Sequence, residues 1–315
     1  DMVGYSLIVE QVGRGDSSAR TVVSVQTSLV CGSIETWGTE EQKHEWLPRL
    51  CSGEALGCFG LTEPDTGSDA ANLSTRATKV DGGWKISGQK QWISLGNFAK
   101  LALVFAQTDP DQKHRGLACF LVPTDSPGFS SEKIHGKLGL RSSDTAELSF
   151  TDVKVPVEDM LGEPGKAFTY LTHNLPQERL GIAIGAYAMS AAAVRFAHEY
   201  VKERTVFGRE VASFQNTKFV LADCKADVDA MQAVCDRALD ALDLDELTPA
   251  DAASAKLFTT ELAAKVIDKC LQLHGGYGYM LEYPVANLYA DTRVSRIYGG
   301  TSEVMRSIVA KSMGL

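Results

Sequence analysis

The sequence predicts a mixed α+β protein in which a small β-domain lies between two helical parts of the chain. Residues 1–57 and 161–315 repeat apolar residues at helical spacing, three or four positions apart. Residues 58–160 contain short apolar or alternating runs separated by turn-forming Gly, Asp and Pro, as in a barrel or sandwich. We therefore predict a partial N-terminal helical domain (1–57), a middle β-domain (58–160) and a C-terminal helical bundle (161–315).

The N-terminal part enters a helix almost at once, over residues 6–12. Thr39 is followed three positions later by Gln42, which indicates a capping box in which the two side chains satisfy unpaired N–H groups. The helix that begins there is expected to turn Trp46, Leu47 and Leu50 inward.

The middle part alternates between polar and apolar residues over 85–93, which predicts a strand with one buried face. Further strands are predicted for the apolar runs 101–106, 118–122, 146–150 and 153–155. From about residue 163 the spacing becomes helical. Helices are predicted over 168–204 and 214–242, from the Thr248 cap to Gly275, and over 284–296 and 301–313. Long helices with short links form a bundle.

Composition excludes several classes of function. The net charge is −9, from 31 basic and 40 acidic side chains, and no basic cluster favours nucleic acid as a partner. The seven cysteines form no C-x-x-C pair, and no secretory signal precedes them, so we expect reduced thiols in a cytoplasmic protein and no metal site. No apolar run approaches the about 20 residues of a membrane span, so we expect no membrane partner.

The most informative motif is L-T-E-P-D-T-G-S-D at residues 61–69. Pro64 fixes one φ angle and Gly67 permits a turn that other residues resist. Thr62 and Ser68 offer hydroxyls around that turn, and a rigid loop of hydroxyls and backbone N–H groups suits a flat cofactor with polar edges. The segment closely resembles the flavin loop T-E-P-x-x-G-S-D of the acyl-CoA dehydrogenases.

The resemblance to this family continues along nearly the whole chain, in order and at the family's spacing. The matching segments are W-I-S at 92–94, R-T-V-F-G at 204–208, Gln215, Q-L-H-G-G at 272–276 and I-Y-G-G-T-S-E at 297–303. Together they imply an acyl-CoA dehydrogenase-like fold, bound FAD and a tetramer, either homomeric or heteromeric. Family members usually begin with several more helices, so we expect the short start to be a truncation; the alternative is an authentic short variant.

The resemblance also implies individual cofactor contacts. Those of one subunit are Phe59, Leu61, Thr62, Gly67, Ser68, Trp92 and Ser94. Those from a neighbouring subunit, toward the adenine and pyrophosphate, are Arg204, Phe207, Gln215, Gln272 and Gly276. Arg suits pyrophosphate because its planar fork binds two oxygens. Thr301 and Glu303 are expected at a helix N-terminus, which is a favourable place for phosphate. Many members carry Gln at the position of Glu303.

The implied reaction is α,β-dehydrogenation of an acyl thioester. A carboxylate removes the α-proton as a hydride leaves the β-carbon for flavin N5, and fixed hydrogen-bond donors to the thioester carbonyl stabilise the enolate. Most members carry this base in the sequence Y-E-G-T, where the present chain has Gly299. Isovaleryl- and long-chain-type members also have Gly there and place their Glu on the first long helix of the bundle. The matching segment L-P-Q-E-R-L at 175–180 makes Glu178 the expected base.

Two carboxylates in one apolar pocket would repel each other, which explains why one position is empty when the other is filled. A base in such a pocket should have a raised pKa. The alternative for Glu178 is a surface carboxylate paired with Arg179 or Arg204. Beside the base, the resemblance places Ser68, Gln177, Arg179 and the Gly299 N–H at the substrate; Arg179 is otherwise a structural ion-pair partner.

Residues 16–26 resemble a segment of glutaryl-CoA dehydrogenases in which an Arg meets the substrate's far carboxylate. They also resemble dehydrogenases of carboxylated acyl carrier protein thioesters. This resemblance makes Arg20 a candidate for binding a terminal carboxylate, since an Arg in an apolar pocket needs an anionic partner. The alternative is that Arg20 pairs with Asp16 or a nearby Glu outside the pocket.

The expected substrate is therefore an acyl-CoA or acyl carrier protein thioester, with an electron-transfer flavoprotein as acceptor. Two other readings stay open. Gly299 also suits a non-catalytic subunit whose partner in a mixed tetramer supplies the base. A flavin oxidase or monooxygenase on the same fold would use oxygen instead.

Overall fold

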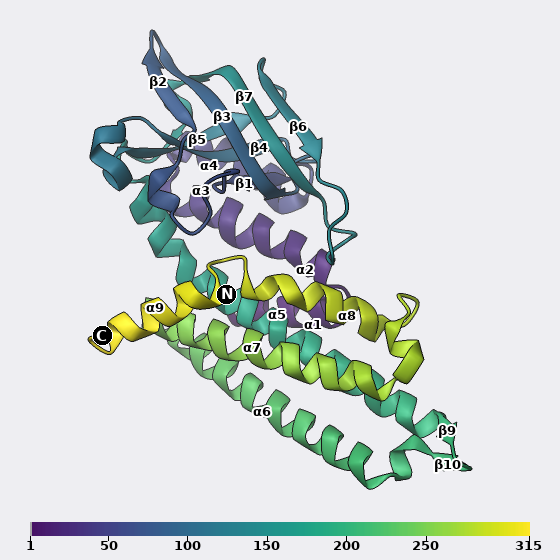
Figure 1. Ribbon diagram of the computed structural model, residues 1–315. Coiled ribbons are helices and arrows are strands. Elements are labelled where there is room, and N and C mark those ends of the chain that lie inside the picture. Colours follow the sequence, from purple (N-terminus) through teal and green to yellow (C-terminus); the bar gives the residue numbers. More distant parts are fainter. Residues whose placement is uncertain (1) are drawn as a thin grey trace. The chain divides into compact units, whose positions relative to one another are not determined.

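A computed structural model describes residues 2–315 (Figure 1). By contacts between residues the chain forms two compact units, which are described separately. The helical unit comprises residues 2–20, 138–141 and 176–315, and the β unit comprises residues 21–137 and 142–175. The division falls within two helices, α2 (Ser17–Ser24) and α5 (Ala167–Glu203).

The helical unit is a bundle whose helices begin and end close to the predicted positions, which confirms the helical periodicity. Besides the C-terminal part of α5 it contains α1 (Met2–Gly15), α6 (Gln215–Asp243), α7 (Pro249–Leu273), α8 (Pro284–Thr292) and α9 (Ser302–Ser312). Short 3-10 turns lie at Val211–Ser213, Gly275–Tyr279 and Arg293–Arg296. A small hairpin, β9 (Thr205–Val206) and β10 (Arg209–Glu210), lies between α5 and α6 in the chain.

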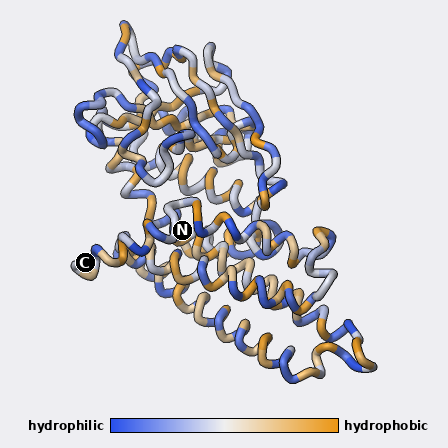
Figure 2. The backbone as a smooth tube through the Cα atoms, in the orientation of Figure 1, coloured by the Kyte–Doolittle hydropathy of each residue, from blue (hydrophilic) through white to orange (hydrophobic). Residues whose placement is uncertain are grey.

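Helix α7 packs into this bundle along one face. One stripe of its residues is buried, and most of them are small: Ala252, Ala253, Ala255, Lys256, Thr259, Thr260, Ala263, Val266, Ile267 and Cys270. Small side chains allow close approach of the neighbouring helices. Helix α6 packs against α7, and in Figure 2 apolar and polar residues alternate along α6, as expected for a helix with one buried face. Lys256 is the exception in this stripe, since a lysine is almost never fully buried without a partner.

Helix α5 corrects the expectation that no segment resembles a membrane span. It is long and apolar enough to cross a bilayer by length and composition, but 78% of its most apolar window is buried inside the fold. Interspersed Gly, Ser and Tyr prevent a continuous apolar run in this helix. These properties are those of a core helix.

The β unit contains one eight-stranded sheet with the order β6-β7-β3-β2-β4-β5-β8, and β1 pairs with β4 in parallel. The strands are β1 (Gly57–Gly60), β2 (Arg76–Val80), β3 (Gly83–Ser94), β4 (Leu101–Gln107), β5 (Leu117–Pro123), β6 (Phe129–Lys133), β7 (Thr145–Pro156) and β8 (Met160–Leu161). The two predicted strands at 146–150 and 153–155 are thus one long strand. Short 3-10 turns cover Ala70–Asn72, Pro110–Gly116 and Val157–Asp159.

Every residue of β4 is buried, because both faces of the strand are covered. Ala102 and Val104 belong to one apolar cluster, and Leu101, Leu103 and Phe105 belong to a second. The second cluster includes residues from three helical segments that precede the sheet in the chain, namely the π-helical segment Val25–Cys31, α3 (Gly32–Trp37) and α4 (Glu40–Ser52).

The predicted capping box is present at the start of α4. The Gln42 backbone N–H donates to the Thr39 hydroxyl at 3.3 Å, and the Thr39 N–H donates to Gln42 Oε1 at 3.0 Å. The Gln42 amide also donates to the carbonyls of Glu158 and Met160, at 2.7 and 3.0 Å. The Gln42 side chain therefore caps the start of the helix and ties it to the edge of the sheet.

Candidate active site

The loop at residues 61–69 lies in the β unit between β1 and β2. Glu63 and Thr66 exchange two backbone hydrogen bonds, at 2.9 and 3.2 Å, which close the loop into a tight turn. The Gln91 N–H donates to the Thr62 carbonyl at 2.8 Å and joins the loop to β3. Gly67 has no neighbouring atom within 4 Å of the place where a Cβ would stand, and Ser68 is exposed, so the tip of the turn is open.

A buried ion pair holds this loop in place. Glu63 and Lys90 lie 2.8 Å apart, and their side chains are 1% and 0% exposed. Glu63 also accepts hydrogen bonds from the Ser74 and Thr75 backbone N–H groups, at 2.6 and 2.9 Å, and Lys90 donates to the Leu61 carbonyl at 3.0 Å. Burial would raise the pKa of the Glu63 carboxyl, but Lys90 and these donors lower it to about 2. Sequence reasoning missed this pair.

Trp92 stands out on β3 by both exposure and backbone. The pairing of β3 with β7 shifts register between Lys90 and Ile93, and Trp92 lies in this irregularity with φ +62° and 59% of its surface exposed. A left-handed backbone is unfavourable for a bulky residue, by about 1–3 kcal/mol, so the surrounding strand must impose it. An exposed indole held in a fixed orientation suits stacking against a flat ring.

The seven predicted flavin contacts of one subunit all belong to the β unit. Phe59 and Leu61 are half-buried at and just after the end of β1, and the Phe59 and Phe105 rings lie 4.9 Å apart. Thr62, Gly67 and Ser68 lie on the loop, and Trp92 and Ser94 lie at the end of β3. The bond from the Gln91 N–H to the Thr62 carbonyl joins the loop to β3. An open turn, hydroxyls and an exposed indole are groups that suit a flavin.

Glu178 lies in the helical unit on α5, half-buried. A Cβ built on Gly299 would stand 3.7 Å from Glu178 Oε1, so the two positions adjoin as predicted from the exchange of the base. The same Cβ would stand only 2.4 Å from Ile182 Cδ1, one helical turn further along α5. Within residues 2–315 the Glu178 carboxylate makes no hydrogen bond and no ion pair, unlike the surface pair with Arg179 or Arg204 considered above.

Three cations surround this carboxylate. Lys256 of α7 is 1% exposed, and its ammonium would lie 3.8 Å from a Cβ on Gly299. Arg179 is 6% exposed, and Arg20 of α2 is 3% exposed. Burial raises the pKa of Glu178 above 4.5, against the opposing influence of Lys256, Arg179 and Arg20. The result is a carboxyl whose proton affinity lies above that of a free Glu.

The backbone that faces Glu178 is held by the same cations. Lys256 Nζ donates to the Tyr298 carbonyl at 2.5 Å and also to the Gly300 carbonyl, and Arg179 Nε donates to the Gly299 carbonyl at 3.4 Å. The sequence analysis did not identify Lys256 as a site residue. A lysine on an otherwise small and apolar face of a helix could have indicated a buried cation.

Arg20 points into this cluster rather than to Asp16. Its Nη2 donates to the Tyr298 hydroxyl at 3.0 Å, and its side chain packs on Gly185, two helical turns along α5 from Glu178. The Asp16 carboxylate instead accepts from the Ala19 N–H at 2.9 Å. Gln177 lies apart from the cluster, where its amide contacts the Met2 sulfur at 3.6 Å.

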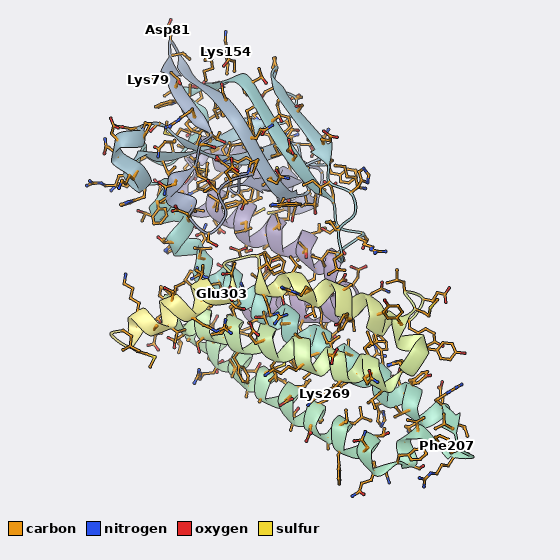
Figure 3. All side chains as sticks on the ribbon, viewed as in Figure 1. Lys79, Asp81, Lys154, Phe207, Lys269 and Glu303 are labelled. Atoms are coloured by element: carbon orange, nitrogen blue, oxygen red, sulfur yellow. The ribbon has the colours of Figure 1, made fainter. Side chains whose placement is uncertain are left out.

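The contacts predicted to reach a neighbouring subunit gather near the β9–β10 hairpin and the end of α7. Arg204 and Gly276 line a cavity of about 460 Å³ together with Tyr200, His274 and Tyr277. Gln215 begins α6, and Gln272 is exposed near the end of α7. Phe207 is 95% exposed at the tip of the hairpin (Figure 3). These groups have no role in the cluster around Glu178.

Thr301 is the N-cap residue of α9, and Glu303 lies in the first turn of the same helix. Figure 3 labels Glu303. The Thr301 hydroxyl accepts from the Val304 N–H at 3.3 Å and so caps the helix. Glu303 is exposed and lies 3.5 Å from Arg306. Hydrogen bonds from its own backbone N–H and from Thr301 lower the pKa of Glu303.

Comparison with known proteins places the chain in a family. Models of three acyl-CoA dehydrogenase domains match it in order: the N-terminal domain at residues 1–54, the middle domain at 58–153 and the C-terminal domain at 165–314. The chain belongs to the acyl-CoA dehydrogenase family. It is an oxidoreductase of fatty acid metabolism and, like the family, a flavoprotein with FAD as cofactor.

Individual relatives resemble nearly the whole chain. An acyl-CoA dehydrogenase of Bacillus subtilis is 39% identical over 311 residues, which cover 99% of this chain and 82% of that protein. The structure of butyryl-CoA dehydrogenase from Megasphaera elsdenii is 37% identical with a TM-score of 0.96, over 100% of this chain and 82% of that one. A glutaryl-CoA dehydrogenase from Mycobacterium smegmatis in complex with FADH2 is 36% identical with a TM-score of 0.94, over 99% and 80%.

We predict that Glu63→Gln destabilises the β unit by about 3–5 kcal/mol, because it leaves the Lys90 ammonium buried without its carboxylate. Urea unfolding followed by tryptophan fluorescence measures this. The control is Glu132→Gln, which removes an exposed carboxylate of β6. Since the pKa of Glu63 is about 2 in the fold and 4.5 is its ordinary value, the stabilisation from this carboxylate is complete above pH 4.5 and declines as the pH falls toward 2. Burial lowers the pKa of Lys90 to about 8, so the ion pair is also lost as the pH rises above that value. Equal stability of the two variants would contradict the assignment.

Proposed function

We propose that the chain catalyses α,β-dehydrogenation of an acyl thioester, with Glu178 as the base that removes the α-proton. The observation that carries the proposal is the Glu178 carboxylate, half-buried and without a polar partner in the described chain, beside Gly299. Most family members would carry their base at the place of Gly299, as the sequence resemblance implies. Bound FAD supplies the acceptor for the β-hydride.

The environment of Glu178 suits a general base. Because burial raises its pKa, the carboxylate takes up a proton more readily than a free Glu, while the nearby cations keep it ionised for the attack. Another carboxylate of the helical unit, Glu261 on α7, accepts from the Ser302 hydroxyl at 2.6 Å and pairs with Arg296 at 3.2 Å. A carboxylate held in this way is structural.

The backbone N–H of Gly299 is the proposed donor to the thioester carbonyl. Neither Gly299 nor Gly300 uses its N–H in a hydrogen bond within the described residues. An unused N–H donor on the residue that adjoins the base would stabilise the enolate oxygen as it gains charge. Arg179, which donates to the Gly299 carbonyl, would hold the following peptide of the same segment.

We propose that FAD is held by the contacts predicted from the sequence, with Trp92 and Ser94 at the ring and Thr62, Gly67 and Ser68 along the loop. Arg204, Phe207, Gln215, Gln272 and Gly276 are proposed to reach the cofactor of a neighbouring subunit in a tetramer. Their exposure at the hairpin end of the bundle supports this role. The proposed acceptor of electrons is an electron-transfer flavoprotein.

Two substrate classes have support. Similarity to a butyryl-CoA dehydrogenase favours short, neutral acyl-CoA thioesters. Arg20 favours a carboxylated acyl-CoA or acyl carrier protein thioester, because its buried guanidinium lies on the same face of α5 as Glu178. Anaerobic reduction of the flavin by a panel of neutral and carboxylated thioesters, followed by admission of air, separates these classes and distinguishes a dehydrogenase from an oxidase or an inert subunit.

We predict that Glu178→Gln lowers the rate of flavin reduction by roughly 10²–10⁴-fold, because a positioned base is lost while shape is kept. FAD content and thioester binding should persist. Stopped-flow absorbance under nitrogen measures the rate, and Glu203→Gln, at the exposed end of the same helix, is the control. A near wild-type rate in Glu178→Gln would place the base elsewhere.

We predict that Arg20→Gln impairs turnover of carboxylated thioesters far more than that of neutral thioesters of equal length. A buried substrate carboxylate left without its cation costs on the order of 3–5 kcal/mol. The ratio of kcat/KM for the two substrates is the readout, because a general loss of stability affects both alike. Arg195→Gln, an exposed change on α5, is the control. An unchanged ratio would exclude this role.

A further inference from the structure

The lysine at position 256 is the least expected side chain of the helical unit. It lies in the buried stripe of α7, where its neighbours at helical spacing are Ala252, Ala253, Thr259 and Thr260. Burial of an ammonium is unfavourable by several kcal/mol unless hydrogen bonds and charges compensate. A methionine of similar volume would fill the same space without that cost, so packing does not account for the lysine.

The contacts of Lys256 converge on the backbone that bears the proposed oxyanion donor. Its ammonium accepts no bond and donates to the carbonyls of Tyr298 and Gly300, on either side of Gly299. In a trans peptide the C=O and N–H bonds point in opposite directions. Because the Tyr298 carbonyl is turned toward Lys256, the Gly299 N–H of the same peptide is turned away from the ammonium and stays free.

Glycine allows this arrangement but does not enforce it. Gly299 and Gly300 have φ angles of +61° and +94°. Glycine reaches these values readily, but it also reaches many other backbone conformations. Two adjacent glycines would leave the segment mobile, and the convergence of two carbonyl dipoles on one point is repulsive without a cation. Lys256 supplies that cation and selects one of the available backbone conformations.

We propose that Lys256 is a positioning residue for proton abstraction, which fixes the Gly299 N–H toward the thioester and keeps the Glu178 carboxylate ionised. This inference rests on the proposed function of Glu178 and adds a residue that acts through it. The charged and polar groups that face the same space are Glu178 and Arg179 of α5, Arg20 of α2, and the Tyr298 hydroxyl. Glu261, which also lies on α7, is engaged with Arg296 and Arg306.

The charge of Lys256 affects the pKa of Glu178 in a definite direction. Lys256 lowers the pKa of Glu178 against the effect of burial, so its removal should raise that pKa further. Burial in turn lowers the pKa of Lys256 to about 8, although Glu178 opposes this change. The ammonium is therefore protonated at neutral pH and acts as a cation where the base must be ionised.

The test compares Lys256→Met with wild type in anaerobic flavin reduction between pH 5 and 9. We expect the maximal rate to fall roughly 10–10²-fold, comparable to the loss of one oxyanion donor. We also expect the acid limb of the profile to move up by about one pH unit. Lys265→Met, an exposed change on the same helix, should alter neither. FAD content and melting temperature are recorded for each variant, and if Lys256→Met loses its flavin, Lys256→Gln is judged by the same two readouts.

A purely structural role for Lys256 would lower FAD content or melting temperature without moving the acid limb, and that outcome would overturn the inference. An unchanged rate and profile would overturn it too. Glu178→Gln, measured in parallel, decides the proposed function separately. If Glu178→Gln is inactive and Lys256→Met behaves as wild type, the base assignment stands and the positioning role does not. If Glu178→Gln keeps its rate, the proposed function fails irrespective of Lys256.

Discussion

The left-handed backbone at Gly299 is the constraint on which the proposed chemistry depends. With φ at +61°, and with Ile182 Cδ1 2.4 Å from the place of a Cβ, this position disfavours any side chain. The space that a side chain would need is the space beside the Glu178 carboxylate. The loop and α5 are therefore alternatives for carrying an acid at this point, and this chain has its acid on the helix.

Each unit contains a buried lysine that donates hydrogen bonds to backbone carbonyls and lies near a carboxylate. The pKa of the two carboxylates is shifted in opposite directions. Lys90 holds the Leu61 carbonyl and pairs with Glu63, whose oxygens are saturated with donors and whose pKa is lowered to about 2. Lys256 holds the carbonyls on either side of Gly299 and stands near Glu178, whose oxygens accept no bond from the described chain and whose pKa is raised. Because hydrogen-bond donors occupy the Glu63 oxygens, that carboxylate is structural. Within residues 2–315 Glu178 accepts no such bonds and can therefore take up a proton.

Local patterns in the sequence predicted most of the fold. Apolar spacing predicted the long helices, and the Thr39–Gln42 capping box and the Thr248 cap are both present. The adjacency of Glu178 and Gly299 was predicted from an exchange between two motifs and is seen in the structure. Interactions between distant segments were not predictable in this way. The sequence around Lys90 does not indicate that Glu63 is its partner, and the sequence around Lys256 does not indicate Tyr298. The contact of Arg20 with Tyr298, 278 positions away, is of the same kind.

The most direct test of the central claim follows the α-proton itself. A thioester that lacks a removable β-hydrogen is incubated with the FAD-loaded enzyme in deuterated water, so that oxidation does not compete, and deuterium at the α-carbon is measured by mass spectrometry. We predict enzyme-dependent exchange with the wild type and only background exchange with Glu178→Gln, at equal thioester binding. Exchange by Glu178→Gln at the wild-type rate would contradict it.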